Sequence, residues 1–166
     1  MNAARLFALE QAHLAGEDSA EVVEVLAKIG KTADATSVGS CVFARRPGDG
    51  SAREQAASCQ KVLGGFANIC YEYATKRYRS NCINWGIVPF TLPGGVQFDY
   101  SDGDWIYIPN LREGILQGKE EFAAKVISGE TVADITLCCR GLIPEERKIL
   151  TEGCLMNYYA AQRAGN

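Results

Sequence analysis

The sequence predicts an α/β fold in which helices cover the faces of a mixed β-sheet. Three observations lead to this prediction. Short apolar runs alternate with segments of helical spacing, glycine-rich turns separate them, and a helix that begins with proline closes the chain. Alternating strands and helices joined by short turns are typical of βαβ units and of a sheet flanked by helices.

The N-terminal part of the chain is predicted to be helical. Residues 3–15 and 19–29 carry apolar side chains at helical spacing. The second segment starts with Asp18-Ser19-Ala20-Glu21, which suits a helix N-terminus, and ends at Gly30, which suits a helix stop. We therefore expect two helices in this region.

A βαβ unit follows. Residues 38–44 (VGSCVFA) form a mostly apolar run typical of a buried strand, and the turn-rich run at 45–50 ends it. A helix is expected at 51–63, where the sequence begins with Ser-x-x-Glu and closes on two glycines. The apolar run at 66–70 supplies the second strand, so strand, turn, helix and strand predict a right-handed βαβ unit.

The middle of the chain predicts another helix and a hairpin. Residues 73–85 are compatible with a helix, which Gly86 breaks before an extended exit at 87–90. Residues 96–100 and 105–108 are apolar runs separated by Ser-Asp-Gly-Asp. That pattern predicts a β-hairpin.

The C-terminal part predicts one strand and one long helix. The strand is expected at 132–139, and the helix opens at Pro144-Glu145-Glu146 and continues to about Arg163, because proline and acids suit a helix start. No linker is recognisable after Asp34. We therefore divide the chain into an N-terminal helical segment, 1–33, and one domain, 34–166.

The composition excludes some functional classes. Apolar residues make up 47% of the 166 residues and charged residues 22%, and the formal net charge is −3. This balance gives no field that attracts nucleic acid or an anionic membrane. The basic run Lys76, Arg77, Arg79 is expected to be a solvated or interface surface rather than an RNA site. With no apolar span of membrane length, we expect a cytoplasmic protein without a membrane or nucleic-acid partner.

The cysteines predict reduced thiols. There are seven, an odd number, and no two are spaced as Cys-x-x-Cys. A disulfide framework or a metal cluster held by this chain alone is therefore not expected, since cluster ligands are usually closely spaced. The single histidine, His13, is expected to be a surface residue.

The candidate chemistry lies in the run 48–54, GDGSARE. Ser51 and Arg53 stand at the start of a helix that follows a strand. Free N–H groups at such a start favour an anion, glycines let it approach the backbone, and an arginine can hold a carboxylate by two hydrogen bonds. The alternative is that Ser51 and Glu54 form only a capping box, which stabilises a helix by about 1 kcal/mol.

Four segments resemble the aconitase family. The run GDGSAREQAA at 48–57 is similar to the family's Gly-Ser-Ser-Arg-Glu-His-Ala signature, and SNCINWGIVPF at 80–90 is similar to its Asn-x-x-x-x-Gly-[Leu/Ile]-[Leu/Val]-Pro-[Leu/Phe] segment. The runs at 103–115 and 144–159 resemble its Gly-Asp-x-Ile-x-Ile-x-x-Leu segment and its closing helix. The likeness is to the C-terminal swivelling β/β/α domain, with aconitase-like hydratases nearer than the small subunit of isopropylmalate dehydratase.

The resemblance implies roles for individual residues. Ser51 matches the serine that removes a proton beside a substrate carboxylate, and Arg53 matches the arginine that binds a carboxylate. Gly50 and Ala52 flank Ser51 as substrate-binding positions, although Ala52 replaces the family's second serine and so puts specificity in doubt. Arg45 and Arg46 are candidates for a cationic substrate entrance, or for two solvated arginines on a turn.

The resemblance also implies partners. The chain would be part of a hydro-lyase that acts on a hydroxy di- or tricarboxylic acid and uses a [4Fe-4S] cluster bound by another domain or subunit, with no cofactor in this chain. The family's opening Asp-x-x-Thr segment is not matched, which implies a fragment of a longer hydratase or a branch with a replaced N-terminus. We expect the isolated chain to be inactive. A stand-alone small subunit and a catalytically silent paralogue with a binding role are the alternatives.

Overall fold

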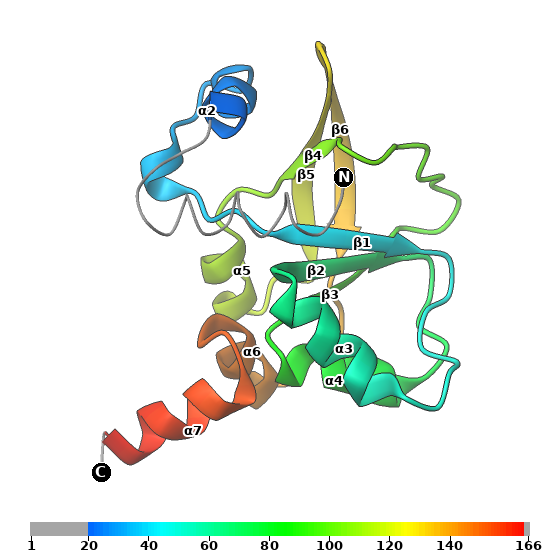
Figure 1. Ribbon diagram of the computed structural model, residues 1–166, viewed down its shortest axis with the longest axis vertical. Helices are drawn as coiled ribbons and strands as arrows, with labels where there is room; N and C mark the ends of the chain where they lie inside the picture. Colours follow the sequence, from blue (N-terminus) through cyan, green and yellow to red (C-terminus); the bar gives the residue numbers. More distant parts are fainter. Residues whose placement is uncertain (1–19, 165–166) are drawn as a thin grey trace.

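A computed structural model describes residues 20–164 of the chain, and the expected helix at 3–15 and His13 lie outside this range. Figure 1 shows a central sheet with helices around it. In chain order the elements are α2 (Ala20–Ala27), the 3-10 helix η1 (Ala33–Ala35), β1 (Ser40–Ala44), α3 (Arg53–Val62), β2 (Gly65–Cys70), α4 (Lys76–Asn84), β3 (Val88–Thr91), β4 (Trp105–Tyr107), α5 (Leu111–Gln117), β5 (Glu121–Ser128), β6 (Thr131–Cys138), α6 (Pro144–Thr151) and α7 (Leu155–Ala164).

The sheet is mixed, as predicted. Its strand order is β1-β2-β3-β6-β5-β4. β1, β2 and β3 run parallel, whereas β4, β5 and β6 form an antiparallel half. The two halves meet through the antiparallel pair Thr91 and Cys138. The sheet therefore consists of two three-stranded halves with a short junction.

Apolar packing covers both faces of the parallel half. Helices α3 and α4 lie on one face (Figure 1), where Ala57, Tyr78 and Cys82 are buried. A larger core joins the other face to the antiparallel half through Phe90 and Phe122, whose rings meet edge to face with centroids 5.8 Å apart. Side chains rather than a long ladder thus hold the two halves together.

The βαβ unit and several other predicted elements are confirmed. β1 pairs with β2 in parallel, and α3 connects them. The helix expected at 19–29 is α2, the extended exit at 87–90 is β3, and the strand expected at 132–139 is β6. The βαβ unit places the loop after β1 at the carboxyl ends of the parallel strands.

The prediction that β1 is a buried strand is wrong. Cys41, Val42 and Phe43 are exposed. β1 is the edge strand of the sheet, and within residues 20–164 no strand pairs with its outer side. An apolar run of this length cannot by itself distinguish an edge strand from a central one.

The predicted hairpin is also wrong. Residues 96–100 form no strand, and β4 instead pairs with β5, with Ile106 opposite Val126. The aromatic rings of the expected strand are used for packing, because Phe98 stacks on Phe43 of β1 with ring centroids 4.3 Å apart. Tertiary contacts therefore override the local hairpin pattern.

The C-terminal helix is divided, contrary to the single helix predicted. α6 ends at Thr151 and α7 begins at Leu155, with Gly153 between them at a φ of +91°. A positive φ interrupts a right-handed helix, and glycine adopts it without strain. In Figure 1, α7 consequently extends away from the body of the domain.

Three elements were not predicted: the 3-10 helix η1, α5 and β5. In β5 the side chains alternate between exposed and buried along most of the strand, and Phe122, Ala124 and Val126 point into the core. Lys125 on the exposed face is bonded to Asp134 of β6 at 2.8 Å. No helix among residues 20–164 is long and apolar enough to cross a membrane.

Candidate active site

Five of the six predicted site residues lie in one loop at the carboxyl end of β1, and the sixth, Arg53, is the first residue of α3. This loop, residues 45–52, runs beside the segment that follows β2. The backbone N–H of Tyr71 donates to the carbonyl oxygen of Arg45 at 3.2 Å, and the N–H of Ala74 donates to that of Pro47 at 2.9 Å. Carboxyl ends of parallel strands are the usual place for ligands in α/β sheets.

Gly48 is the point at which the loop turns onto α4. Its φ is +97°, and a Cβ atom there would lie 2.5 Å from the Cβ atom of Tyr78. Its carbonyl oxygen accepts two hydrogen bonds, from Thr75 Oγ1 at 3.0 Å and from Arg53 Nε at 2.9 Å. Only glycine fits this position, because both the backbone angle and the space exclude a side chain.

Ser51 is exposed, and so are Gly50 and Ala52 beside it. The N-cap residue of α3 is Ala52, which forms no side-chain cap. Glu54 does not reach back to Ser51, because its Oε1 atom accepts a hydrogen bond from Trp85 Nε1 at 3.0 Å. The capping-box interpretation of Ser51 and Glu54 is therefore wrong.

The start of α3 is open to an anion. The first three N–H groups of an α-helix have no carbonyl one turn earlier to bond, and their dipoles favour negative charge. Within residues 20–164 the Ser51 hydroxyl has no hydrogen-bond partner. A substrate carboxylate or a developing oxyanion could approach this hydroxyl and these N–H groups together.

Arg53 braces the loop from the first turn of α3. It is half-buried, and its guanidinium donates from Nε to Gly48 and from Nη2 to the carbonyl oxygen of Asp49 at 3.4 Å. A guanidinium has five N–H donors, so others remain for a carboxylate. The structure thus gives Arg53 a supporting contact that the sequence did not predict.

The two arginines of the candidate entrance differ. Both are exposed, and Arg46 Nε lies 2.9 Å from Glu72 Oε1 in an ion pair whose side chains are each 64% exposed. Such a pair holds Arg46 only weakly. Arg45 forms no ion pair with any residue of the described part of the chain. Of the two, Arg45 is the cation free to meet an anionic ligand.

Thr75 and Tyr78 belong to this site, and the sequence analysis missed both. The helix expected at 73–85 begins at Lys76, with Thr75 as its N-cap accepting a hydrogen bond from the Tyr78 N–H at 3.3 Å. The preference of threonine for N-caps could have identified this boundary. Tyr78 is held in turn by Asn68, whose Nδ2 donates to the Tyr78 hydroxyl at 3.2 Å.

The cysteines do not fit as ligands of a metal cluster. No three histidine, cysteine, aspartate or glutamate side chains in residues 20–164 could together hold a metal ion. Burial raises the pKa of the Cys70 and Cys82 thiols to about 11 and that of Cys139 to about 12. Metal ligation needs the thiolate, which these surroundings disfavour.

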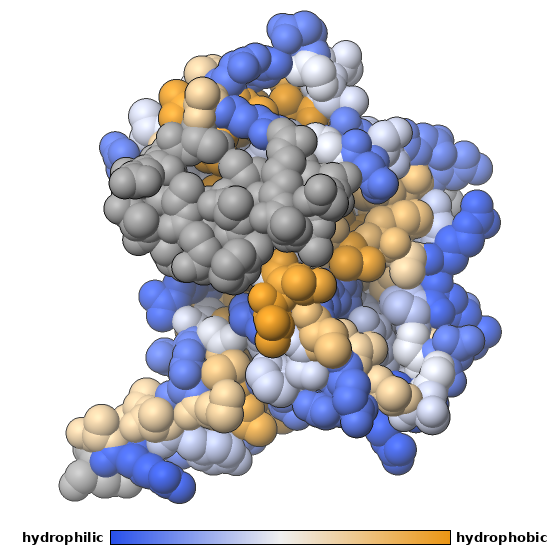
Figure 2. Space-filling model, viewed as in Figure 1, coloured by the Kyte–Doolittle hydropathy of each residue, from blue (hydrophilic) through white to orange (hydrophobic). Residues whose placement is uncertain are grey.

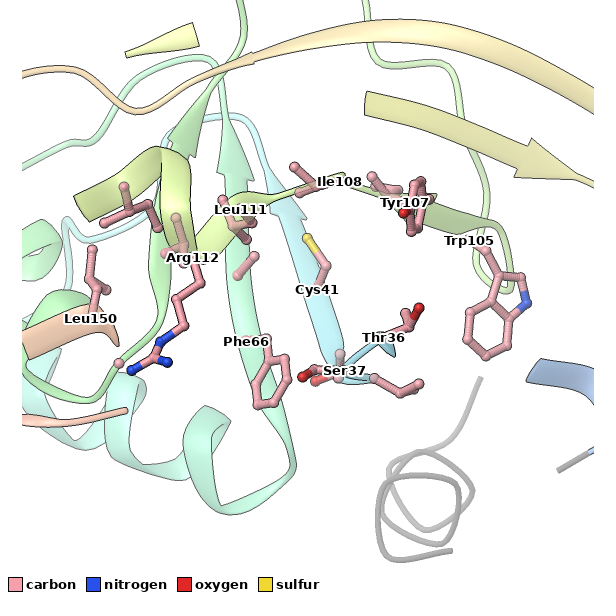
Figure 3. Close-up of a pocket in the computed structure, with 18 of the residues that line it drawn as sticks. Thr36, Ser37, Cys41, Phe66, Trp105, Tyr107, Ile108, Leu111, Arg112 and Leu150 are labelled. Carbon is pink, nitrogen blue, oxygen red and sulfur yellow. The ribbon is translucent and has the colours of Figure 1, made fainter. Parts of the chain in front are cut away.

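A separate hollow lies at the opposite ends of β1 and β2. Its volume is about 530 Å³, and Figure 3 shows Cys41, Phe66, Leu111 and Arg112 around it. None of the six predicted site residues lines it. In Figure 2 a patch of apolar surface is visible near the middle of the molecule. The hollow and the 45–52 loop are therefore separate features of the described part of the chain.

Known proteins of similar sequence include two dehydratase-type small subunits and an aconitate hydratase. The homoaconitase small subunit of Thermus thermophilus is 36% identical over 119 residues, which cover 71% of this chain and 62% of that protein. The 3-isopropylmalate dehydratase small subunit of Sulfurisphaera tokodaii is 35% identical over 67% of this chain and 56% of that protein. Aconitate hydratase A of Bradyrhizobium diazoefficiens is 27% identical over 67% of this chain but only 12% of that protein.

A solved structure agrees with these relatives. The crystal structure of 3-isopropylmalate dehydratase LeuD from Methanocaldococcus jannaschii superposes with a TM-score of 0.51 at 25% identity, covering 80% of this chain and 70% of that one. No family model matches the chain. The chain spans less than two thirds of the length of each curated relative it matches.

Proposed function

Because this chain is a homologue of the aconitase-family small subunits and has a LeuD-like fold, we propose that it is the swivelling domain of a hydro-lyase. The reaction would be the reversible loss of water from a hydroxy di- or tricarboxylic acid. The observation that carries this proposal is the exposed Ser51 hydroxyl beside the open start of α3. We assign residues 34–166 to this domain.

In this proposal Ser51 removes the proton from the carbon beside a substrate carboxylate. A serine hydroxyl is a weak acid, so its alkoxide needs nearby positive charge. The N-terminus of α3 supplies a partial positive charge at Ser51. Exposure of Ser51 suits a base that meets its substrate only when a second domain closes over it.

Arg53 would bind a carboxylate of the substrate while it braces the loop. Because Nε already donates to the Gly48 carbonyl oxygen, the N–H groups at the outer edge of the guanidinium remain for a two-point contact with a carboxylate. Gly50 has no atom within 4 Å of the position that a Cβ would occupy, so a ligand can approach the backbone there. Arg45 and Arg46 would attract the anion to the loop.

Ala52 distinguishes this site from its relatives' signature. It is exposed and offers no hydroxyl beside Ser51. A substrate oxygen at this position would lose one hydrogen-bond donor, so the preferred acid is expected to differ from that of an enzyme with two serines. This same replacement favours the second candidate function, a catalytically silent paralogue that binds a carboxylic acid.

The partner would be an aconitase-type chain or set of domains that carries a [4Fe-4S] cluster. The described residues of this chain do not fit as cluster ligands, so we propose that every ligand belongs to the partner. The partner would be joined in the same polypeptide or would be a separate large subunit. A cytoplasmic location fits such an enzyme and remains part of the proposal.

The test uses the full-length protein with its cluster-bearing partner, reconstituted anaerobically with iron and sulfide. Citrate, isocitrate, 2-methylcitrate, isopropylmalate and homocitrate are screened by absorbance of the unsaturated product. Ser51→Ala should lower kcat by about 10²–10⁴-fold, as expected for loss of a general base. Ser58→Ala, whose hydroxyl donates to the Gln55 carbonyl in the same helix, is the control and should keep its turnover.

Stability measurements complete the test. Since the Ser51 hydroxyl has no partner in residues 20–164, Ser51→Ala should leave the melting temperature unchanged. Full turnover in Ser51→Ala would contradict the assignment of the base. Substrate binding without turnover by the reconstituted wild-type enzyme would instead support the silent paralogue.

A further inference from the structure

Thr75 connects the start of α4 to the Ser51 loop through a single hydroxyl. The oxygen accepts a hydrogen bond from the Tyr78 N–H at 3.3 Å, which caps α4. The same hydroxyl donates to the Gly48 carbonyl oxygen at 3.0 Å, across 27 residues of sequence. One side chain therefore both caps the N-terminus of α4 and holds the loop.

Among residues 20–164, the hydrogen bond from Thr75 to Gly48 is the last one between the loop and the body of the domain before Ser51. Arg45 and Pro47 are bonded to the segment after β2, and Gly48 is bonded to Thr75. Beyond Gly48, Asp49 accepts a hydrogen bond from Arg53 and Ala52 accepts one from Ala56, and both donors lie in α3 itself. Thr75 thus fixes where Ser51 stands relative to the body of the domain, and Arg53 fixes where it stands relative to α3.

The support beneath this contact is rigid. Tyr78 packs against Gly48 and is 8% exposed, and its hydroxyl is held by Asn68, which is 2% exposed. Asn68 is held in turn by Gln60 Nε2 of α3, at 2.6 Å from its Oδ1 atom. The donor on Thr75 and the surface on which Gly48 rests therefore belong to one packed unit.

We propose that Thr75 is a positioning residue for catalysis, which holds the Gly48 carbonyl and thereby fixes the Ser51 hydroxyl at the start of α3. This inference rests on the proposed role of Ser51. A displacement of about 1 Å can lower a rate by 10²-fold, so loss of this one donor is expected to matter. Arg53 belongs to α3 and is expected to keep its position when Thr75 is replaced. Because Arg53 is the residue proposed to bind the substrate carboxylate, the defect should appear in kcat rather than KM.

Three substitutions separate the two uses of the hydroxyl. Thr75→Ser keeps both the donor and the acceptor. Thr75→Asp keeps the acceptor that caps α4, because aspartate is a good N-cap, but an ionised carboxylate has no proton to donate to Gly48. Thr75→Val has the same shape as threonine and keeps neither. The aspartate variant is the decisive one, since a cap-only role predicts that it behaves as wild type.

The experiment is done on the full-length enzyme with its cluster-bearing partner. Melting temperature, kcat, KM and amide hydrogen exchange of Ala74, whose N–H donates to the loop at Pro47, are measured for each variant. Thr75→Asp should melt as wild type, exchange faster at Ala74 and lose about 10–100-fold in kcat with little change in KM. Thr75→Ser should restore all wild-type values.

The possible results are distinguishable. Wild-type exchange and kcat in Thr75→Asp would overturn the inference. Faster exchange with unchanged kcat would support the anchor and refute the role of Ser51, so failure of the proposed function would be recognised separately. Should Thr75→Asp not fold, Thr75→Val decides: faster exchange at Ala74 supports the anchor, and a change confined to α4 overturns it.

Discussion

Replacing Gly48 by alanine would place a methyl group where the structure has no room for one. The new Cβ atom would lie 2.5 Å from Tyr78 Cβ, an atom fixed directly to the backbone of α4. The φ of +97° adds backbone strain of about 1–3 kcal/mol for a residue other than glycine. Overpacking of a filled site adds about 1–3 kcal/mol. We therefore expect Gly48→Ala to lower the free energy of unfolding by about 2–6 kcal/mol.

Gly50→Ala is the matched control in the same loop. No atom lies within 4 Å of its added Cβ, and its φ is not positive. Urea denaturation of both variants should show a large loss of stability for Gly48→Ala and almost none for Gly50→Ala. For a domain of this size the larger loss corresponds to a decrease in melting temperature of roughly 4–24 °C. Equal midpoints for the two variants would refute the argument from Tyr78.

Three further predictions concern single groups. Arg53→Lys should raise KM, and it should also speed amide exchange of Ala74, whose N–H donates to the loop at Pro47. Lysine loses both the two-point contact with a carboxylate and the Nε donor to Gly48, so a change in KM alone would contradict the brace. The free energy of unfolding should fall above pH 9, because burial raises the pKa of the Cys70 thiol from 9.0 to about 11 and the folded state retains a proton that the unfolded state releases. Urea midpoints measured between pH 7 and 11 test this, and constant midpoints would count against it. A thiol reagent should modify exposed Cys59 in the folded protein and buried Cys82 only after unfolding, as peptide mapping would show.

The sequence predicted the parts of the fold in which local pattern and tertiary structure agree. The run from β1 to β2 has a strand, a glycine turn and a helix whose order alone implies parallel pairing, and the structure confirms it. β5 was missed although its side chains alternate, because Lys125 and the two alanines weaken its apolar pattern. Its identity as a strand depends on pairing with β6, which lies further along the chain.

The candidate site is a prediction from the sequence, and the structure adds contacts that the sequence could not show. Ser51 and Arg53 were recognised from a motif, yet the motif could not show that Arg53 bonds to Gly48. Nor could it show that Ala52, rather than Ser51, is the N-cap. Thr75 lies 27 residues from Gly48, and no local pattern predicts a contact at that separation. The residues proposed for catalysis are thus close together in sequence, whereas Thr75, which holds their loop, is distant in sequence.

The short junction between the halves of the sheet has a consequence for synthesis of the protein. The parallel half, β1 to β3, leaves the ribosome before β5 and β6 exist, and its βαβ unit can already form. Its inner face, with Ile69 and Phe90, then lacks part of its apolar cover until Phe122 and Leu137 emerge. Nascent chains stalled between these points would expose a continuous apolar surface, and they are the species for which a chaperone would be required.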